Sequence, residues 1–243
     1  MYIRDLQAAQ TSRVSVSLTG GNPSGYATPN DISADGRYVV FESIATNLVS
    51  GDTNGKTDVF IRDRSLGINL RASVGPNGQG NGSSRDGTIS SDGHYVAFYT
   101  AATNLWPIAD ANGTASDIFE FDVWANTLIG HLSVGQDDVW ANAAATQNPA
   151  ISGDGLYVAY QSRATNLIGV ASDGTVLDTN GTDDIFTHLW VDSRTKCDHE
   201  ATEPAEARTD TLRSHFTWWW DRPRITTEGA RTWTPRDRIQ HRT

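Results

Sequence analysis

A single motif, Ile-Ser-x-Asp-Gly-x-Tyr-Val, is repeated three times along this chain and constrains its fold more than any other feature. The copies begin at Ile32, Ile89 and Ile151, so they start 57 and 62 residues apart. Each copy is followed by Ala-Thr-Asn-Leu, then by an Asp-x-Asn-Gly loop and an Asp-(Val/Ile)-Phe segment. A period of this length is typical of a supersecondary unit that cannot bury its own apolar faces and therefore stacks on its neighbours.

Each repeat has the sequence pattern of four short strands. In the first repeat, Asp35-Gly36 predicts a hairpin turn, because Gly adopts a positive φ and Asp tolerates the left-handed conformation. Residues 37–43 have apolar side chains on both faces, which indicates a strand that is buried on both sides. Four antiparallel strands of this kind form one blade of a β-propeller. The strands expected in the first repeat are 27–33, 37–43, 58–63 and 69–74.

The whole chain is therefore predicted to be all-β, an incomplete β-propeller of about three four-stranded antiparallel blades with a tail that does not repeat. The chain opens in the middle of a blade, because residues 2–5 match residues 60–63. It is expected to be a piece of a longer propeller, or an open arc whose exposed sheet edges can pair with other chains. The expected segments are a partial blade at 1–17, blades at 27–75, 82–134 and 147–186, and a tail at 187–243.

The tail breaks the pattern directly after Phe186, where a fourth strand of the Arg-x-Ser-Val type is expected. Two interpretations are open. The tail is a distinct C-terminal segment that acts through Trp218, Trp219 and Trp220, or it is a reading-frame artefact that replaced the remaining blades. A break inside a strand favours the artefact, because domain boundaries fall in linkers. A segment with so few aliphatic residues is expected to be poorly ordered.

The Ile-Ser-x-Asp-Gly-x-Tyr-Val segments and the Asp-(Val/Ile)-Phe strands resemble the repeat of TolB-like, WD-repeat-like propellers of bacterial periplasmic and secreted proteins. The resemblance covers residues 1–186. It implies a propeller fold and a periplasmic or extracellular location. The function that we predict is that of a non-enzymatic interaction scaffold. An alternative that it leaves open is the propeller domain of an exported prolyl-oligopeptidase-type hydrolase, or a TolB-like envelope transport component. No signal peptide is expected in the chain as written, which begins Met-Tyr-Ile-Arg-Asp.

The charge balance excludes one class of partner. The net charge of −10 argues against nucleic acid, because phosphate binding needs clustered Lys and Arg. No apolar run is long enough to span a membrane. The chain has no Gly-x-Ser-x-Gly, His-Glu-x-x-His, P-loop or dinucleotide motif, so we predict that it is not an enzyme and that its partner is another protein.

The Asp-x-Asn-Gly loops are the candidate metal sites. Short Asp/Asn loops supply several oxygens within a few residues, and Ca²⁺ takes 6–8 oxygen ligands. The alternative is that these residues only form turns, since Asn-Gly favours turns and Asp side chains accept from turn amides. The candidate ligands are Asp52, Asn54 and Asp58, then Asp110, Asn112 and Asp117, then Asp178, Asn180 and Asp184.

Three further sets of residues are expected to be structural. Leu of each Ala-Thr-Asn-Leu segment is expected in the core, with Thr and Asn bonded to loop amides, although a ring of ligand-facing groups is the alternative. The aspartates of the Asp-Gly turns, Asp35, Asp92 and Asp154, are expected to bind backbone amides. The repeated aromatic residues are expected to be buried between blades: Tyr38, Tyr95 and Tyr157, with Phe41, Phe98 and Tyr160.

Overall fold

The computed structural model describes residues 1–108, 110–135, 139–145, 148–169, 177–189 and 194–197. These residues belong to one compact unit, Met1–Thr202, and the second unit, Glu203–Thr243, lies outside the described residues. Every regular element in the described part of the chain is a β-strand. Accordingly, the described residues contain no helix with the length and apolar character needed to cross a membrane.

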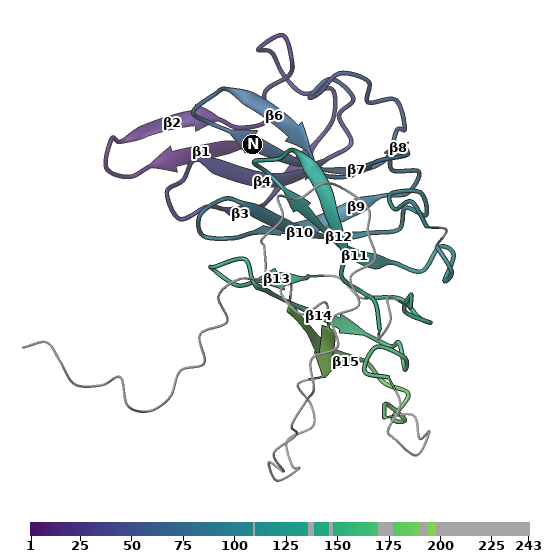
Figure 1. Cartoon of the computed structure of the whole chain (residues 1–243). Helices are drawn as coiled ribbons and strands as arrows, with labels where there is room; N and C mark the ends of the chain where they lie inside the picture. The colour runs from purple at the N-terminus through teal and green to yellow at the C-terminus, as the bar shows by residue number, and fades with distance from the viewer. Residues whose placement is uncertain (109, 136–138, 146–147, 170–176, 190–193, 198–243) are drawn as a thin grey trace, which may run out of the picture. The chain divides into compact units, whose positions relative to one another are not determined.

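The strands form three four-stranded antiparallel sheets, and in each sheet the spatial order of the strands follows the chain order (Figure 1). This arrangement is a propeller blade, so the predicted all-β architecture of four-stranded blades is confirmed. The first blade contains β3 (Ala27–Ile32), β4 (Tyr38–Ser43), β5 (Asp58–Asp63) and β6 (Ile68–Arg71). The second contains β9 (Ser84–Ile89), β10 (Tyr95–Thr100), β11 (Asp117–Asp122) and β12 (Thr127–His131). The third contains β13 (Ala150–Ile151), β14 (Tyr157–Ser162), β15 (Asp184–Leu189) and β16 (Arg194–Cys197).

Two hairpins accompany the blades. The first pairs β1 (Tyr2–Asp5) with β2 (Gln10–Arg13) and is the expected half-blade. Its ladder ends where Tyr2 pairs with Arg13, inside the partial blade expected at 1–17. The second hairpin pairs β7 (Val74–Gly75) with β8 (Gly78–Gln79), which the sequence did not predict.

The third blade extends past the boundary that the sequence placed at residue 186. β15 continues to Leu189, and β16 pairs with it at Arg194–Cys197, inside the segment assigned to the tail. The two inner strands pair over six residues, from Tyr157↔Leu189 to Ser162↔Asp184. The remainder of the expected tail, including Trp218–Trp220, lies outside the described residues.

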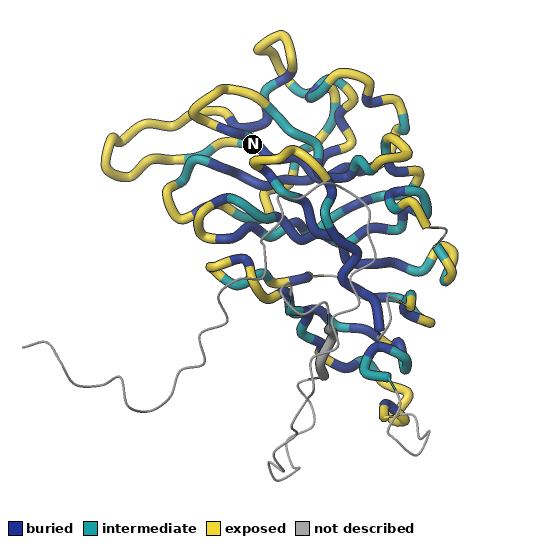
Figure 2. The backbone as a smooth tube through the Cα atoms, in the orientation of Figure 1, coloured by how far each residue is buried: buried dark blue, intermediate teal, exposed yellow. Residues whose placement is uncertain are grey.

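The core lies between successive blades, and the middle strands carry it (Figure 2). Side chains alternate along β4, so Val39 and Phe41 face the half-blade while Tyr38 and Val40 face the second blade. Phe41 stacks on Phe60 of β5, with ring centroids 5.6 Å apart. The same alternation places Ala97 and Ile118 of the second blade against the third, where they meet Val158, Tyr160 and Phe186.

A repeated contact joins the Asp-Gly turns of the second and third blades to the tyrosine of the preceding blade. A Cβ atom at Gly93 would lie 2.3 Å from Cδ2 of Tyr38, and one at Gly155 would lie 2.5 Å from Cδ2 of Tyr95. Backbone hydrogen bonds run beside these contacts, from Ala34 N to Ser91 O and from Ser91 N to Gly153 O, each 2.9 Å. The turns at Gly93 and Gly155 therefore cover the tyrosine ring of the blade before them.

The expected burial of the repeated aromatic residues is confirmed at four of the six positions. Phe41, Phe98 and Tyr160 are at most 2% exposed, and Tyr38 is 6% exposed. Tyr95 is only half-buried, and Tyr157 is 48% exposed, so the expectation was wrong for Tyr157. The reason is positional: no further Asp-Gly turn among the described residues follows the third blade to cap Tyr157.

Candidate functional site

The three Asp-x-Asn-Gly loops occupy the same place in each blade, between its second and third strands. The last aspartate of each loop is the first residue of the third strand. These aspartates are Asp58, Asp117 and Asp184, and each is at most 3% exposed. A buried carboxylate needs a partner, because removing its charge from water is costly. The partners differ from blade to blade.

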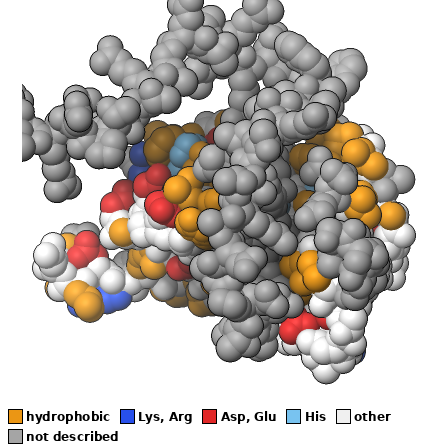
Figure 3. All heavy atoms as spheres, turned by 60° about the horizontal axis from the view of Figure 1, so that its bottom comes forward, with side chains coloured by type: hydrophobic (Ala, Val, Ile, Leu, Met, Phe, Trp, Pro, Cys, Tyr) orange, Lys and Arg blue, Asp and Glu red, His pale blue; other side chains and the backbone are white. Residues whose placement is uncertain are grey.

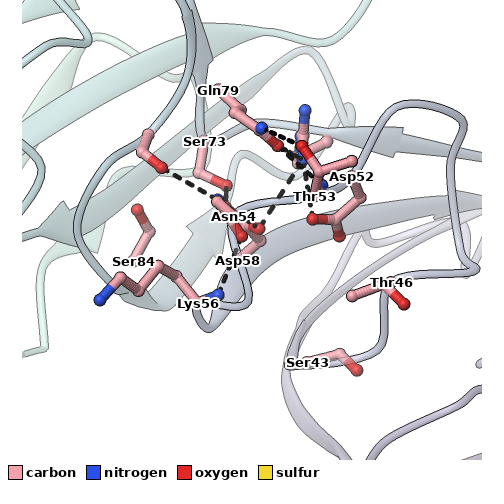
Figure 4. Close-up of polar contacts among 12 residues, drawn as sticks. Ser43, Thr46, Asp52, Thr53, Asn54, Lys56, Asp58, Ser73, Gln79 and Ser84 are labelled. Carbon is pink, nitrogen blue, oxygen red and sulfur yellow. Dashed lines mark hydrogen bonds and ion pairs between the residues drawn. The ribbon is translucent and has the colours of Figure 1, made fainter.

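In the first blade the partner is an arginine (Figure 4 shows the loop). Nη1 of Arg71, at the end of β6, lies 3.3 Å from Oδ1 of Asp52 and 3.8 Å from Oδ2 of Asp58. Ser73 donates a hydrogen bond of 2.5 Å to the other oxygen of Asp58. Gln79 of β8 accepts from Arg71 at 3.3 Å and so holds the guanidinium in place. Asp52 and Asp58 therefore converge, and the point on which they converge is filled by a cation from the chain itself.

The asparagines of the three loops direct their amide nitrogen toward the final aspartate, whereas a metal ligand would direct its amide oxygen there. Nδ2 of Asn54 donates to Asp58 at 3.1 Å, while Oδ1 of Asn54 accepts from the amide of Lys56 at 2.9 Å. Asn180 repeats both contacts, with Nδ2 on Asp184 at 2.9 Å and Oδ1 on the amide of Thr182 at 2.8 Å. Asn112 likewise points Nδ2 at Asp117, at 3.2 Å. The expected convergence of the asparagine oxygen with the carboxylates is therefore not observed, because that oxygen is used in the turn in the first and third loops.

In the second blade a histidine takes the place of the arginine. Nε2 of His131, at the end of β12, lies 3.2 Å from Oδ1 of Asp117 and 2.9 Å from Oγ of Ser133. Ser133 also donates to the same Asp117 oxygen, at 2.9 Å. These three residue types occur in hydrolase triads, but a triad uses both ring nitrogens of its histidine. Here one nitrogen contacts both partners, and Ser133 is fully buried and accepts from the amide of Ile118, so the arrangement is a structural network.

In the third blade the corresponding register position carries neither residue. Phe186 of β15 pairs with Cys197 of β16, as Phe60 pairs with Arg71 and Phe119 with His131. Asp184 accepts from Asn180, and Asp178 is 7% exposed. Neither carboxylate oxygen of Asp178 has a hydrogen-bond partner.

Burial dominates the electrostatics of these loops. It raises the pKa of Asp58 to about 6, against the opposing effects of the Ser73 hydroxyl and the Arg71 charge. Burial likewise raises the pKa of Asp52 and of Asp110. For Asp178 burial is again the first cause of a raised pKa, and the negative charge of Asp184 adds to it.

The sequence interpretation missed Arg71, His131 and Ser133 as parts of these sites. A signal was present, because Arg71-x-Ser73 and His131-x-Ser133 occupy equivalent places in the fourth strands. The strand register was needed to bring those places beside the loops.

The Thr and Asn of each Ala-Thr-Asn-Leu segment form hydrogen bonds with the residues that precede the first strand of the same blade. We call this set of hydrogen bonds a bracket. In the second blade, Oδ1 of Asn104 accepts from Asn81 N at 2.9 Å, and Nδ2 of Asn104 donates to Gln79 O at 3.0 Å. Asn81 also bonds Thr103 twice, at 2.8 Å each. Asn142 makes the matching contacts with Thr165 and Asn166 in the third blade. The leucines Leu48, Leu105 and Leu167 are fully buried, so the expected structural role of these segments is confirmed.

Replacing Asn104 with alanine is expected to destabilise the chain by about 2 kcal/mol, because the Asn81 amide and the Gln79 carbonyl lose their partner. Urea unfolding measures this loss. The control is Asn30→Ala at an exposed position of β3, where a change of less than about 0.5 kcal/mol is expected. Equal losses in the two variants would contradict the role of the bracket.

The Asp-Gly turns contain the expected turn chemistry. Oδ1 of Asp35 accepts from Ser33 Oγ at 2.6 Å and from Arg37 N at 2.9 Å. Asp92 and Asp154 make the same pair of contacts in the other two blades. These three aspartates are therefore committed to the backbone of their turns.

Comparison with solved structures places these blades beside known propellers. The chain resembles TolB-like propellers. TolB from Acinetobacter baumannii aligns with a TM-score of 0.43 and 13% identity, over 81% of this chain and 36% of TolB. A putative TolB from Agrobacterium tumefaciens aligns with a TM-score of 0.42 and 14% identity, over 71% of this chain and 48% of that chain. The β-propeller domain of the Trilobed protease from Pyrococcus furiosus aligns with a TM-score of 0.40 and 11% identity, over 71% of this chain and 41% of that chain.

This chain spans less than half the length of each of these three structures. No family model and no curated protein matches it. The description of the fold accordingly rests on the strand order and registers of the three blades themselves.

Proposed function

We propose that this chain is a non-enzymatic propeller segment that acts as a protein-interaction scaffold, in the periplasm or outside a bacterial cell. The location follows from the resemblance of its repeat to exported TolB-like propellers. The scaffold role is supported by one observation above the others, which is the exposed face of the third blade.

Each blade presents one face to the blade that follows it. In the first blade this face includes Tyr38 and Val59, which are at most 6% exposed. In the third blade the equivalent residues are Tyr157 and Ile185, which are 48% and 37% exposed. We call Tyr157, Ala159 and Ile185 the open face. Figure 3 shows the chain from the side on which β14 and β15 lie in Figure 1, and hydrophobic side chains are among those in view.

The half-blade presents the complementary surface at the other end of the described chain. Tyr2 of β1 occupies the position of Phe60 on β5, which packs against the preceding unit in the first blade. Phe60 is fully buried, whereas Tyr2 is 64% exposed. The guanidinium of Arg13 lies 5.7 Å from the centre of the Tyr2 ring. The open face of the third blade and the outer face of the half-blade are thus the two surfaces that pack together wherever one blade follows another inside the chain.

The partner that fits these two surfaces is a second copy of the chain, with its half-blade packed on the open face of the first. Such a head-to-tail contact is heterologous, so it continues into longer assemblies unless the rotation closes a ring. Exposed apolar sheet faces favour association of this type.

Sedimentation velocity of the full chain tests this proposal. The wild-type chain is expected to form dimers and larger species as its concentration rises. Tyr157→Asp and Tyr2→Asp are each expected to give monomers, because each places a charge in one half of the contact. The control is Leu66→Asp, at a residue that is 64% exposed in the turn between β5 and β6, and it should assemble as the wild type does.

An equal mixture of the two monomeric variants gives the sharpest result. Tyr157→Asp retains an intact half-blade and Tyr2→Asp retains an intact open face, so the mixture is expected to stop at dimers. A wild-type chain that stays monomeric, or a mixture that stays monomeric, would overturn the head-to-tail contact. Hydrolysis of peptide or ester substrates by the purified chain would overturn the non-enzymatic role.

A further inference from the structure

The three loops contain the same pair of acidic residues but differ in the side chains that contact them. In the first loop Arg71 lies within ion-pair distance of both aspartates, and in the second loop His131 contacts the final aspartate, Asp117. The third blade has Cys197 at that register position, and cysteine is not a cationic residue. Among the side chains that the structure describes, no Lys, Arg or His forms an ion pair with Asp178 or Asp184, in contrast to the first loop.

The first loop locates the point on which such a pair converges. Its aspartates are six residues apart, and both lie within ion-pair distance of the single atom Nη1 of Arg71, at 3.3 and 3.8 Å. In the third loop Asp178 and Asp184 have the same spacing. The asparagine between them makes the same two contacts as in the first loop, to the final aspartate and to the amide two residues onward. Since loop length and internal bonds match, Asp178 and Asp184 face a common point that corresponds to the arginine nitrogen.

Asp178 supplies an independent indication of a missing partner. The residue is 7% exposed, and neither of its oxygens makes a hydrogen bond of normal geometry. The Asn180 amide acts to lower its pKa, but burial and the charge of Asp184 outweigh this effect. A buried carboxylate without a partner is costly, and structures retain such groups where a ligand or ion completes them. Its equivalent in the first loop, Asp52, has the ion pair with Arg71.

We propose that the third loop binds one hard divalent cation such as Ca²⁺ through the carboxylates of Asp178 and Asp184. The ion takes the place that the arginine nitrogen has in the first blade. Carboxylate oxygens are the preferred ligands of such ions, and water and backbone carbonyls complete the 6–8 positions of Ca²⁺. The first loop binds none, because Arg71 already occupies the equivalent position. The second loop binds none, because Oδ1 of its final aspartate, Asp117, already contacts Nε2 of His131 and accepts from Ser133.

Calorimetric titration of the full chain with CaCl₂, after removal of metals with EDTA, tests the proposal. One ion per chain is expected. Asp178→Asn should abolish binding, and the matched variant Asp52→Asn in the first loop should leave it intact. Thermal unfolding gives a second readout: the wild-type Tm is expected to rise by about 5 °C when Ca²⁺ reaches 100 times its Kd.

Two features keep the test decisive. In EDTA, Asp178→Asn should unfold at the same temperature as the wild type or at a higher one, because it removes a buried unpaired charge, and its Tm should no longer respond to Ca²⁺. Cys197→Arg restores the residue type of the first blade at the equivalent register position, and it should also abolish binding. Absence of binding to the wild-type chain at millimolar Ca²⁺, binding that survives both variants, or equal loss in Asp178→Asn and Asp52→Asn would each overturn the proposal.

Discussion

Replacing Glu120 with glutamine is expected to stabilise the chain by about 3 kcal/mol at pH 7 and to flatten the dependence of its stability on pH. Glu120 lies on β11 at the position that Ile61 occupies on β5, facing the next blade, and it is 1% exposed. Burial raises its pKa from 4.5 to about 8, with a smaller contribution to this rise from the charge of Asp122. The folded chain therefore keeps the Glu120 proton at neutral pH.

The sign of the effect follows from where the proton is lost. Between pH 4.5 and 8 the unfolded chain has released this proton and the folded chain has not, so stability falls as pH rises. The loss is about 1.4 kcal/mol per pH unit, which amounts to roughly 3 kcal/mol at pH 7. Glutamine keeps the shape of the protonated acid but does not titrate.

Urea unfolding at pH 5, 6, 7 and 8 measures the difference between the wild type and Glu120→Gln at each pH. That difference should widen with pH. The control is Asn30→Ala, which removes no titratable group and leaves Glu120 in place, so its pH slope should match that of the wild type. A constant difference between Glu120→Gln and wild type would show that Glu120 does not titrate in this range.

The second large effect is expected at Gly93. A methyl group there would lie 2.3 Å from Cδ2 of Tyr38, and the residue has a φ of +76°. The left-handed conformation costs a non-glycine residue about 1–2 kcal/mol, and crowding in a packed core adds about 1–3 kcal/mol. Gly93→Ala is therefore expected to destabilise the chain by about 3 kcal/mol.

Gly36→Ala separates the two causes. Gly36 has nearly the same backbone, with a φ of +70°, but its nearest neighbour would be Nη1 of Arg64 at 3.6 Å, an ordinary contact. Gly36→Ala should then destabilise the chain only by the cost of the left-handed backbone conformation, about 1–2 kcal/mol. Combining Gly93→Ala with Tyr38→Leu should recover part of the loss, because the shorter side chain makes room. Equal costs at Gly36 and Gly93 would mean that the ring does not hold the turn.

The repeat allowed the blades to be predicted because their information is local. Residues 37–43 and 58–63 show apolar side chains on both faces within a few residues of one another, and they became β4 and β5. The brackets were predictable for the same reason, since Thr and Asn directly precede a buried leucine in each copy.

What the sequence did not predict depends on how distant segments meet. Arg71 reaches Asp52 only because β6 pairs with β5 in a register that places Arg71 opposite Phe60. Tyr157 has the same local sequence as Tyr38, and the two differ in what the following blade supplies. The strand at 194–197 has no resemblance to β6 or β12, so only its position after β15 could have indicated it.

The brackets have a consequence for how such chains change in evolution. They join Ser24 to Asn47, Asn81 to Asn104 and Asn142 to Asn166, with separations of 23, 23 and 24 residues. Each bracket connects the segment before a blade to the loop after its second strand. The separation changes by only one residue, while the longer Asp-x-Asn-Gly loops vary more in length. A duplicated or deleted segment therefore includes both ends of its own bracket, and only the contacts between neighbouring blades must form again. A gene of this type can gain or lose whole blades without changes to the internal hydrogen bonds of the other blades.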